Sequence, residues 1–567
     1  MLGLTLWDWA ALAVYFCIVL IIGIWTARRV SNTSDFFIGG RRFGKTMMVF
    51  FAFGAGTSGN DAVGVSSKTY VGGLSGIWFQ WLWLFCTPFY WLIAPVFRRM
   101  RALTTGDYFE QRYNGSVAGL YAFVGMGLLT VNIGVLQLGA ASMIEALTGG
   151  AVSRYAAVLA MTALILFYGI AGGLVAAILT DFLQGILTLV LSFLLIPYAL
   201  SAVGGFSGLH EGIQDSHMFS LVAPGEINLF YIIMLCTSAL VGIVTQPHTM
   251  GTCAAGRTEM DGQIGFAAGN LLKRFCTVAW MIVGLCGVVM FAGESPAMDP
   301  DLVYGAVAQR LLPAIMPGLV GIFLAALIAS LQSSCDAFMV SCSALFTQNF
   351  YRRWLVRDKA DGHYVLVGRV TAVVVVLIAV VFSFWVQDVP SGLVWFFKLQ
   401  ALMGAAFWLG LFWRRATVAG AWASTLVGFA VLAVTSLPQF HAWAVTHLPD
   451  TMIWEERFRD SWQIAAYLSS AFAAGIIVSL LTRRVDKAKL DRFYDCLRTP
   501  IQRDELHHPD PFTLPEGVTP PPARKIIQHP DFEILVPSRS AVYGFLFFWA
   551  WVALLIGFVY WLSGVGA

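Results

Sequence analysis

Charged residues are scarce in this sequence. Asp, Glu, Lys and Arg make up 12% of its 567 residues, whereas soluble domains average about 25%. Hydrophobic residues make up 58%. This composition excludes an ordinary soluble domain and predicts a polytopic membrane protein. The formal net charge of +3 says little about partners, and we expect a lipid bilayer and a small solute but no nucleic acid.

Cysteine motifs and catalytic motifs are missing as well. The nine cysteines form no CxxC pair, and all but Cys496 lie in apolar segments. This argues against a disulfide framework or a zinc site, and favours cysteines that act as small buried hydrophobic residues. The sequence also lacks a Walker loop, an HExxH motif and a serine nucleophile elbow. We therefore expect a protein that is not an enzyme.

Long apolar runs are abundant, and runs of about 20 residues mark membrane-spanning helices. The first run, 7–28, is too long for a cleavable signal peptide and lacks a small-residue cleavage site, so it predicts a permanent helix. The pattern predicts an all-α fold with about fourteen spans, near residues 7–27, 44–70, 75–98, 116–147, 153–172, 174–204, 228–251, 262–293, 317–350, 364–387, 390–413, 416–437, 463–482 and 541–563.

Basic residues in the short loops are biased to one side of these spans. An outside N-terminus places the Arg- and Lys-rich loops around 28–45, 98–112 and 352–359 in the cytoplasm, as the positive-inside rule requires. The same alternation puts the C-terminus outside and the Pro-rich segment 483–540 inside. Its proline and charge argue against a packed core, so we expect a solvated linker that touches the cytoplasmic face.

The segment 321–353 carries a polar cluster in the middle of an apolar run. The cluster consists of Ser330, Gln332, Ser333, Ser334 and Asp336. Polar groups at membrane depth are expensive and usually functional. Hydroxyl and carboxylate oxygens within two turns suit a small hard cation, so we interpret this helix as the holder of a coupling ion.

Two other predicted spans are interrupted. The span 44–70 contains FGAGTSGND, in which Thr57, Asn60 and Asp61 follow closely spaced glycines. The span 228–251 contains Gln246 and His248 around a proline. Paired interruptions in two halves of a transporter point to a central binding site. Close helix packing explains the glycines as well, and His248 alone is more typical of a packing residue than of a ligand.

Two further polar positions lie inside apolar runs. Asp181 and Gln184 share one helix face, which indicates either an ion-related role or an ion pair near the cytoplasmic end. Gln80 lies beside Trp81, and an amide next to an indole suits a polar solute with an apolar side. An interfacial aromatic belt is the alternative for this pair.

Several of these segments, in this order, resemble the sodium/solute symporter family. The similar pieces are SDFFIGGRRFG, TTGDYFEQRYN, GIAGGLVAAILTDFLQ and AALIASLQSSCDAFMVSCSALFTQNFYRR, between about residues 35 and 415. The resemblance implies a LeuT-type fold with an inverted repeat of five plus five helices. Its expected parts are an extra N-terminal helix and loop in 1–43, repeats in 44–205 and 206–415, two accessory helices in 416–482, the tail in 483–540 and a last span in 541–567.

The resemblance also implies a sodium site. The family binds sodium with carbonyls of the interrupted first core helix and with carbonyl and hydroxyl groups of the eighth. By position, the carbonyls are those of Gly54, Thr57 and Ser330, and the hydroxyls are those of Ser333 and Ser334. The implied coupling ion is Na⁺.

A second cation site of some family members maps onto Asp181 and Ser333. Asp336 stands where those members carry a hydroxyl. Two nearby carboxylates repel each other unless a cation lies between them or one takes up a proton. We therefore hypothesise that Asp181 and Asp336 bind a second cation or carry a proton.

Family solute contacts map onto Asp61, Gln80 and Gln246, to which the residue patterns add Asn60, Trp81 and His248. Asp61 replaces a neutral amide, and a proline replaces the aromatic gate of sugar carriers. Both departures argue against a sugar. A site carboxylate suits an amine, or hydroxyl groups that donate to it.

These observations predict a sodium-coupled symporter that imports a small polar organic solute by alternating access. A proton-coupled or uncoupled carrier of the same fold is an alternative, and a transporter-like sensor is a weaker one because the tail is short. The resemblance implies a bacterial inner membrane. The sequence predicts neither the solute nor the oligomeric state.

Overall fold

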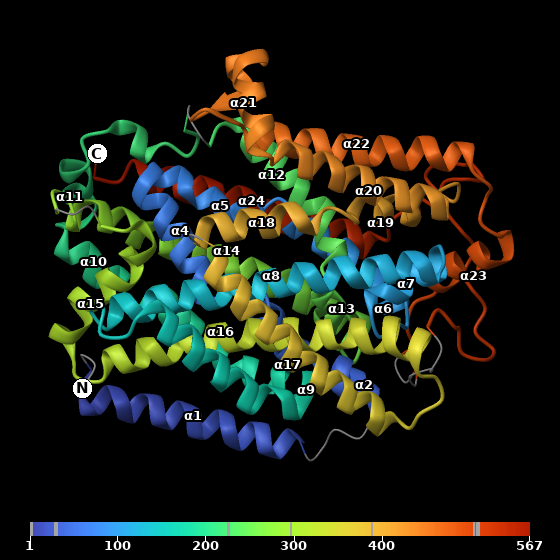
Figure 1. The fold of residues 1–567 in the computed structure, drawn as a ribbon, viewed down its shortest axis with the longest axis horizontal. Helices are drawn as coiled ribbons and strands as arrows, with labels where there is room; N and C mark the ends of the chain where they lie inside the picture. The colour runs from blue at the N-terminus through green and yellow to red at the C-terminus, as the bar shows by residue number, and fades with distance from the viewer. Residues whose placement is uncertain are drawn as a thin grey trace.

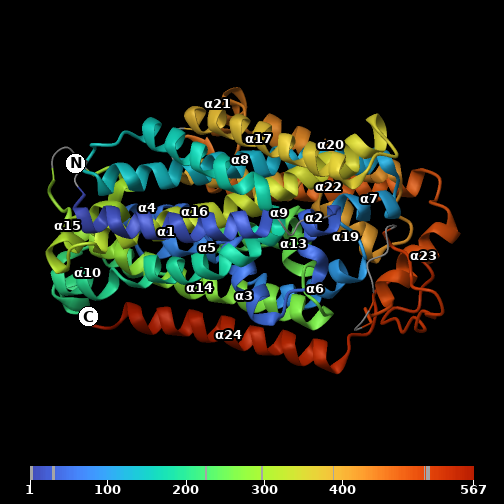
Figure 2. The same ribbon diagram turned by 90° about the horizontal axis from the view of Figure 1, so that it is seen from below.

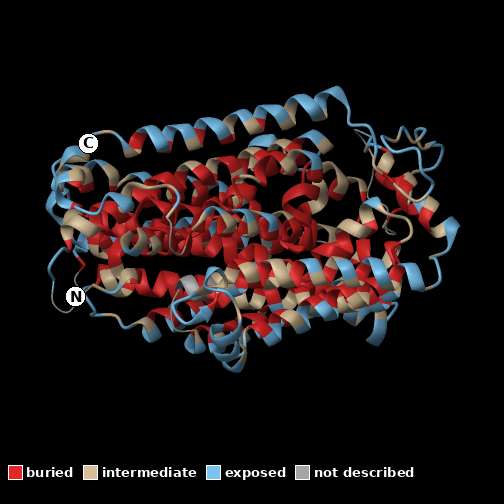
Figure 3. Cartoon of the chain, turned by 90° about the horizontal axis from the view of Figure 1, so that it is seen from above, coloured by how far each residue is buried: buried red, intermediate tan, exposed pale blue. Residues whose placement is uncertain are grey.

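The computed structural model describes residues 4–27, 32–223, 227–294, 298–386, 389–502, 505 and 511–566. Regular structure in this part of the chain is almost entirely helical. Most helices run roughly along one axis, and both termini lie at the same end of the bundle (Figures 1 and 2). Buried residues fill the centre, while the outer helices expose many apolar side chains (Figure 3), as expected for a perimeter that faces lipid.

The first part of the chain contains long helices and short broken ones. Its elements are α1 (Leu6–Ala27), α2 (Thr33–Ile38), η1 (Gly39–Arg41), α3 (Lys45–Gly54), α4 (Gly59–Gly72), η2 (Gly73–Ile77), α5 (Trp78–Trp81), α6 (Thr87–Arg99), α7 (Thr105–Arg112), α8 (Gly115–Leu147), α9 (Arg154–Phe193), α10 (Ile196–Ala202), α11 (Gly205–Gly212) and η3 (Ser216–Phe219).

The second part repeats this mixture of long and broken helices. Its elements are α12 (Leu229–Gly242), η4 (Ile243–Thr245), α13 (His248–Ala254), α14 (Glu259–Met290), η5 (Pro300–Leu302), α15 (Val303–Ile315), α16 (Leu319–Ala344), the π-helical continuation η6 (Leu345–Leu355), α17 (Asp361–Trp385), α18 (Val389–Gln400) and α19 (Gly404–Phe412).

The remaining elements are accessory helices, a small hairpin and the tail. They are α20 (Val418–Thr435), α21 (Pro438–His447), η7 (Asp450–Met452), β1 (Ile453–Trp454), β2 (Arg457–Phe458), α22 (Asp460–Leu481), α23 (Lys487–Arg498) and α24 (Arg539–Ser563). β1 and β2 pair antiparallel, with Ile453 opposite Phe458. α24 lies along the outside of the bundle (Figure 2).

Among the described residues, ten helices are long and apolar enough to cross a membrane, or eleven if α12 and α13 form one bent span. The predicted count of fourteen is therefore not confirmed. The run 75–98 is divided into short segments, and the runs 44–70 and 228–251 are divided at the interruptions that the sequence predicts. The runs 153–172 and 174–204 meet at Gly173, where the helical geometry of α9 breaks (φ 55°, ψ −151°) at the predicted boundary between them.

Glycines allow α14 to pack closely against α3, the first half of the broken helix that α3 and α4 form. Gly265 and Gly269 lie four residues apart on α14, and both contact α3 so closely that a Cβ on Gly269 would lie 2.5 Å from the Val49 carbonyl oxygen. Small residues at this spacing let helix backbones approach each other in membranes. The same spacing points the next residue of this face, Lys273, at the gap between α3 and α4.

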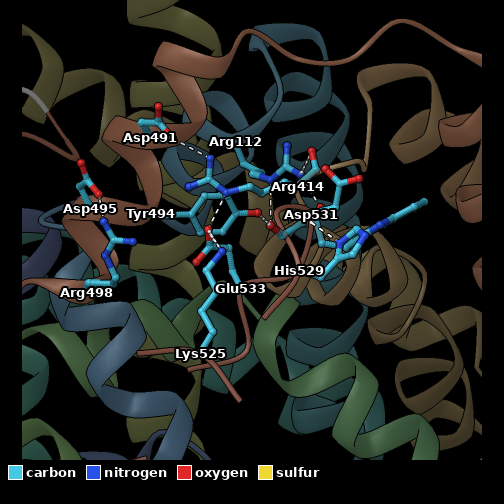
Figure 4. Close-up of polar contacts among 12 residues, drawn as sticks. Arg112, Arg414, Asp491, Tyr494, Asp495, Arg498, Lys525, His529, Asp531 and Glu533 are labelled. Atoms are coloured by element: carbon cyan, nitrogen blue, oxygen red, sulfur yellow. Dashed lines mark hydrogen bonds and ion pairs between the residues drawn. The ribbon is translucent and has the colours of Figure 1, made fainter. Parts of the chain in front are cut away.

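The tail packs against the end of the bundle opposite the termini. Arg101 at the end of α6 forms an ion pair with Glu505 (Nε–Oε1 2.5 Å), and both side chains are buried. Arg414 pairs with Asp491 on α23 at 2.6 Å and with Glu533 at 2.5 Å (Figure 4). The segment expected to be a solvated linker is thus tied down, because its acids meet arginines that end the core helices.

Candidate functional site

The interruption expected in 44–70 lies between α3 and α4. Helix α3 ends at Gly54, and α4 begins at Gly59 with an N-cap at Ser58. The Ser58 backbone N–H donates to Asp61 Oδ2 at 2.9 Å, which fixes the start of α4. The residues between the two helices leave main-chain groups without helical partners, and such groups can bind ions or polar solute atoms.

Helix α16 lies directly against this break. The Ser334 hydroxyl donates to the Gly54 carbonyl oxygen at 3.0 Å, and the Ser330 hydroxyl accepts from the Gly59 N–H at 2.9 Å. A side chain at position 54 would clash with Ser333 Oγ. The structure therefore brings Gly54 into contact with Ser333 and Ser334, and it places Ser330 against the first residue of α4.

The fifth predicted residue, Thr57, lies within the break. Its hydroxyl and that of Ser333 are buried and have no hydrogen-bond partner among the described residues. A buried hydroxyl without a partner costs about 1–3 kcal/mol, and a bound cation would use its oxygen lone pairs. Together with the Gly54 carbonyl, these oxygen donors match the preference of a small hard cation.

Asp181 on α9 lies beside the same glycine. A Cβ on Gly54 would lie 3.4 Å from Asp181 Cγ, and both carboxylate oxygens of Asp181 are buried without a hydrogen bond in the described part of the chain. Asp336 follows Ser333 by one turn of α16 and is buried as well. Asp181 and Asp336 interact electrostatically, so this predicted acidic pair is brought together.

Helix α1 closes this acidic region. Tyr15 donates its hydroxyl proton to Gln332 Oε1, and Gln184 Nε2 donates to the Tyr15 oxygen at 3.2 Å. All three side chains are buried. The extra N-terminal helix thus contributes a polar group next to the two carboxylates, a contact that the sequence pattern of α1 does not reveal.

A cavity of about 70 Å³ lies on the other side of the α3–α4 break. The predicted solute residues Asn60, Asp61, Gln80, Gln246 and His248 all line it, together with Ser334 of the sodium site. Trp81 does not line it. Its indole N–H donates instead to the Arg274 carbonyl oxygen at 3.3 Å, and Trp83 lines the cavity in its place.

The second expected interruption forms the far wall of this cavity. Helices α12 and α13 meet at a bend of 71°, where Pro247 is the N-cap of α13. The Gln246 amide donates to Gln400 Oε1, and the His248 ring lies 4.8 Å from that of Phe338, centroid to centroid. The wall is therefore held by α16 and by the end of α18.

Asp61 does not face the cavity as a lone acid. Its Oδ2 lies 3.0 Å from Lys273 Nζ, with both side chains 8% exposed, and its Oδ1 accepts from Gln80 Nε2 at 2.5 Å. Lys273 also donates to the Gly56 carbonyl oxygen inside the break. A lysine on α14 thus holds the broken helix and supplies the counter-charge of Asp61.

Lys273 and Arg274 are the site residues that sequence reasoning missed. Both line the cavity and are buried, and Arg274 Nη1 donates to the Gln80 carbonyl oxygen at 2.8 Å. The available signal was the pair of adjacent cations within the apolar run 262–293. Ionisable residues inside a span are expensive and usually functional, so the pair could have been singled out from the sequence.

A second, larger cavity of about 830 Å³ is lined in part by η5, which leads into α15 at the end that carries the termini (Figure 1). It is lined by Lys68, about two turns beyond Asp61 on α4, and by Lys398 on α18, which pairs with Asp460 at 2.8 Å. Phe79 lines it next to Gln80 of the smaller cavity. The two cavities therefore follow one another along α4.

Comparisons with known proteins are consistent with this geometry. A model described as the sodium:solute symporter family matches residues 36–428. The osmoregulated proline transporter OpuE of Bacillus subtilis is 25% identical over 85% of this chain and 96% of its own length. A sodium/proline symporter of Staphylococcus aureus is 26% identical over 75% and 84%, respectively.

Solved structures show the same fold. The chain of a Na⁺-coupled sialic acid symporter, solved in a substrate-bound outward-open state, matches with a TM-score of 0.70 and 16% identity. The match covers 85% of this chain and 99% of that one. The nucleobase–cation symporter Mhp1 matches with a TM-score of 0.50 and 14% identity, over 82% and 99%.

Proposed function

Because the chain belongs to the sodium:solute symporter family, we propose that it imports a small polar organic solute together with sodium by alternating access. It is a multi-pass membrane protein and a secondary transporter rather than an enzyme. We further propose the direction of transport, the residues of the ion site and of the solute site, and the orientation of the chain in a bacterial inner membrane.

The observation that carries the proposal is the contact between the broken helix and α16. We assign sodium to the oxygens of Gly54, Thr57, Ser330, Ser333 and Ser334. The Ser334–Gly54 hydrogen bond and the unpartnered hydroxyls of Thr57 and Ser333 support this assignment. A cation there would join two helices from different halves of the chain, and so favour one arrangement of those halves over another.

The acidic pair beside this site favours a second candidate, in which a proton or a second cation is coupled as well. Asp181 and Asp336 are both buried, and two ionised carboxylates in one dry region repel each other. A proton or a cation shared between them removes that repulsion. In this variant the same carrier depends on pH as well as on sodium.

The two ends of the bundle support the proposed direction. The arginine-rich end carrying Arg101 and Arg414 is sealed by tail ion pairs, and the larger cavity lies nearer the opposite end. We place the arginine-rich end in the cytoplasm and both termini outside. Each elementary charge moving inward across about 100 mV supplies about 2.3 kcal/mol, which can drive solute accumulation.

The test uses purified protein and proteoliposomes. We expect NaCl to raise the thermal unfolding temperature above that in choline chloride at equal ionic strength and pH, because a bound ion stabilises the folded state. In proteoliposomes, an inward sodium gradient should drive accumulation of at least one member of a solute panel. Equal unfolding temperatures in the two salts, with accumulation driven by a proton gradient alone, would refute sodium coupling.

A further inference from the structure

We propose that the solute is a small organic anion whose carboxylate binds beside Arg274 and Lys273. This inference rests on the proposed function, since it assigns the occupant of the cavity next to the sodium site. Its basis is the charge of the side chains that line this cavity.

The described lining of the small cavity carries more positive than negative charge. Asp61 is its one carboxylate, whereas Lys273 and Arg274 both contribute cations. Both cations are buried, Arg274 to within 1% exposure and Lys273 to within 7%. A buried charge without a counter-charge is costly, so the wall favours an anion over a neutral or cationic guest.

Arg274 is the cation without an acid of its own. Lys273 is paired with Asp61, but no carboxylate in the described part of the chain lies within ion-pair distance of Arg274. Its Nη1 donates to a neutral carbonyl oxygen, and its Nε has no hydrogen-bond partner among those residues. A planar guanidinium with free donors is the side chain best suited to hold a carboxylate with two parallel hydrogen bonds.

A zwitterion would also need an acceptor for its ammonium group, and Asp61 is the obvious choice. Its oxygens already accept from the Ser58 N–H, the Gln80 amide and Lys273. A carboxylate offers about four lone-pair sites, so an incoming ammonium would find one left, but its charge would add to those of Lys273 and Arg274 beside a single acid. The wall therefore favours a simple carboxylate over an amino acid, even though proline transporters occur among the relatives.

The other residues that line the cavity limit the size and the polarity of the rest of the solute. Phe266, Phe338 and Phe396 supply an apolar wall, and the volume is about 70 Å³. Asn132 and Gln246 offer amides for a hydroxyl or keto oxygen. The predicted occupant is thus a monocarboxylate with a short carbon chain, with or without one further oxygen.

The experiment measures the thermal unfolding temperature of the purified full-length protein, in NaCl and in choline chloride. The probes form matched sets on two carbon skeletons. One set is propionate, propionamide and L-alanine, and the other is cyclopentanecarboxylate, its amide and L-proline, with L-lactate added to test an extra oxygen. We expect one or more of the three carboxylates to raise the unfolding temperature by a few degrees in NaCl, and its uncharged or zwitterionic analogue to raise it less.

The inference is overturned if no carboxylate shifts the unfolding temperature. It is also overturned if an amide or an amino acid stabilises the protein more than its matched carboxylate. The variant Arg274→Gln should lose at least tenfold in affinity for the stabilising carboxylate and still respond to sodium. Arg310→Gln, at an exposed arginine on α15, is the matched control and should bind like the unmodified protein.

The salt comparison without any solute tests sodium binding by itself, so the two ideas can fail separately. A carboxylate that stabilises equally in NaCl and choline chloride would support the solute class and count against sodium coupling. If Arg274→Gln does not fold, the wild-type probe series still decides the inference.

Discussion

The ion pair between Asp61 and Lys273 should dominate the stability of the core around the broken helix. Both side chains are 8% exposed and their charged atoms lie 3.0 Å apart. Removing one partner of such a pair costs about 3–5 kcal/mol, because the other charge stays buried and unpaired. Lys273→Met should fall at the lower end of that range, because Asp61 keeps the hydrogen bonds from Ser58 and Gln80.

Asp61→Asn should cost more than Lys273→Met, since Lys273 then stays buried next to Arg274 with no acid to pair with. The double variant Asp61→Asn with Lys273→Met removes one cation together with the acid. We therefore expect it to be more stable than the sum of the two single losses implies, with a coupling energy of about 2–3 kcal/mol.

The measurement is the thermal unfolding temperature of each purified variant, in the same detergent and salt. The single changes should lower it by about 2–4 °C for a chain of this size. Additive losses in the double variant, to within about 0.5 kcal/mol, would refute the reasoning. Such a result would mean that the two side chains do not depend on each other in the folded protein.

Three further predictions concern the ion sites and the tail. Ser334→Ala should raise the sodium concentration for half-maximal stabilisation about 5- to 100-fold, because it removes one oxygen ligand worth about 1–3 kcal/mol. The control is Ser341→Ala on the same helix. The Ser341 hydroxyl donates to a carbonyl of its own helix, so this change should leave that sodium concentration unaltered. Asp336→Asn should alter the pH dependence or the ion stoichiometry of uptake in proteoliposomes, and unchanged values of both would eliminate the second ion site. Glu505→Gln should lower the unfolding temperature by several degrees because Arg101 loses its buried partner, and a change below 1 °C would show that the tail contact carries little stability.

The family, the LeuT-type architecture and much of the site geometry could be predicted from sequence. The family match over 36–428 and the fold similarity confirm the first two. The interruption around Gly54, the hydroxyls on α16 and the bend before His248 all follow from local patterns, because glycine, proline and polar residues stand out in apolar runs. The structure brings these segments together, and their roles in binding stay predictions.

The parts that sequence reasoning missed depend on contacts between distant residues. Lys273 lies more than 200 residues from Asp61 in the chain, so no local pattern shows that the two neutralise each other. When hydropathy is averaged over a window of residues, the apolar neighbours of the two cations also hide their contribution. The count of fourteen spans treated the run 75–98 as one continuous helix, whereas the structure divides it into short segments.

The tail shows a different reason for an incomplete prediction. Its proline and charge content argued for a solvated linker, yet Tyr494 on α23 is buried and donates to the Gly410 carbonyl oxygen at 2.7 Å. Amino-acid composition indicates how a segment behaves by itself. It does not show that arginines of the bundle lie close enough to pair with the acids of this segment.

These tail contacts also have a consequence for the order in which the protein is made. Arg101 and Glu505 are separated by 404 residues along the chain, and Arg414 and Glu533 by 119. At about 5–20 residues per second, a ribosome needs about 20–80 s after Arg101 to reach its partner. Throughout that time Arg101 lacks the acid that neutralises it. The segment made just before α24 therefore completes the earliest helices, and this end of the bundle closes only when synthesis is nearly over.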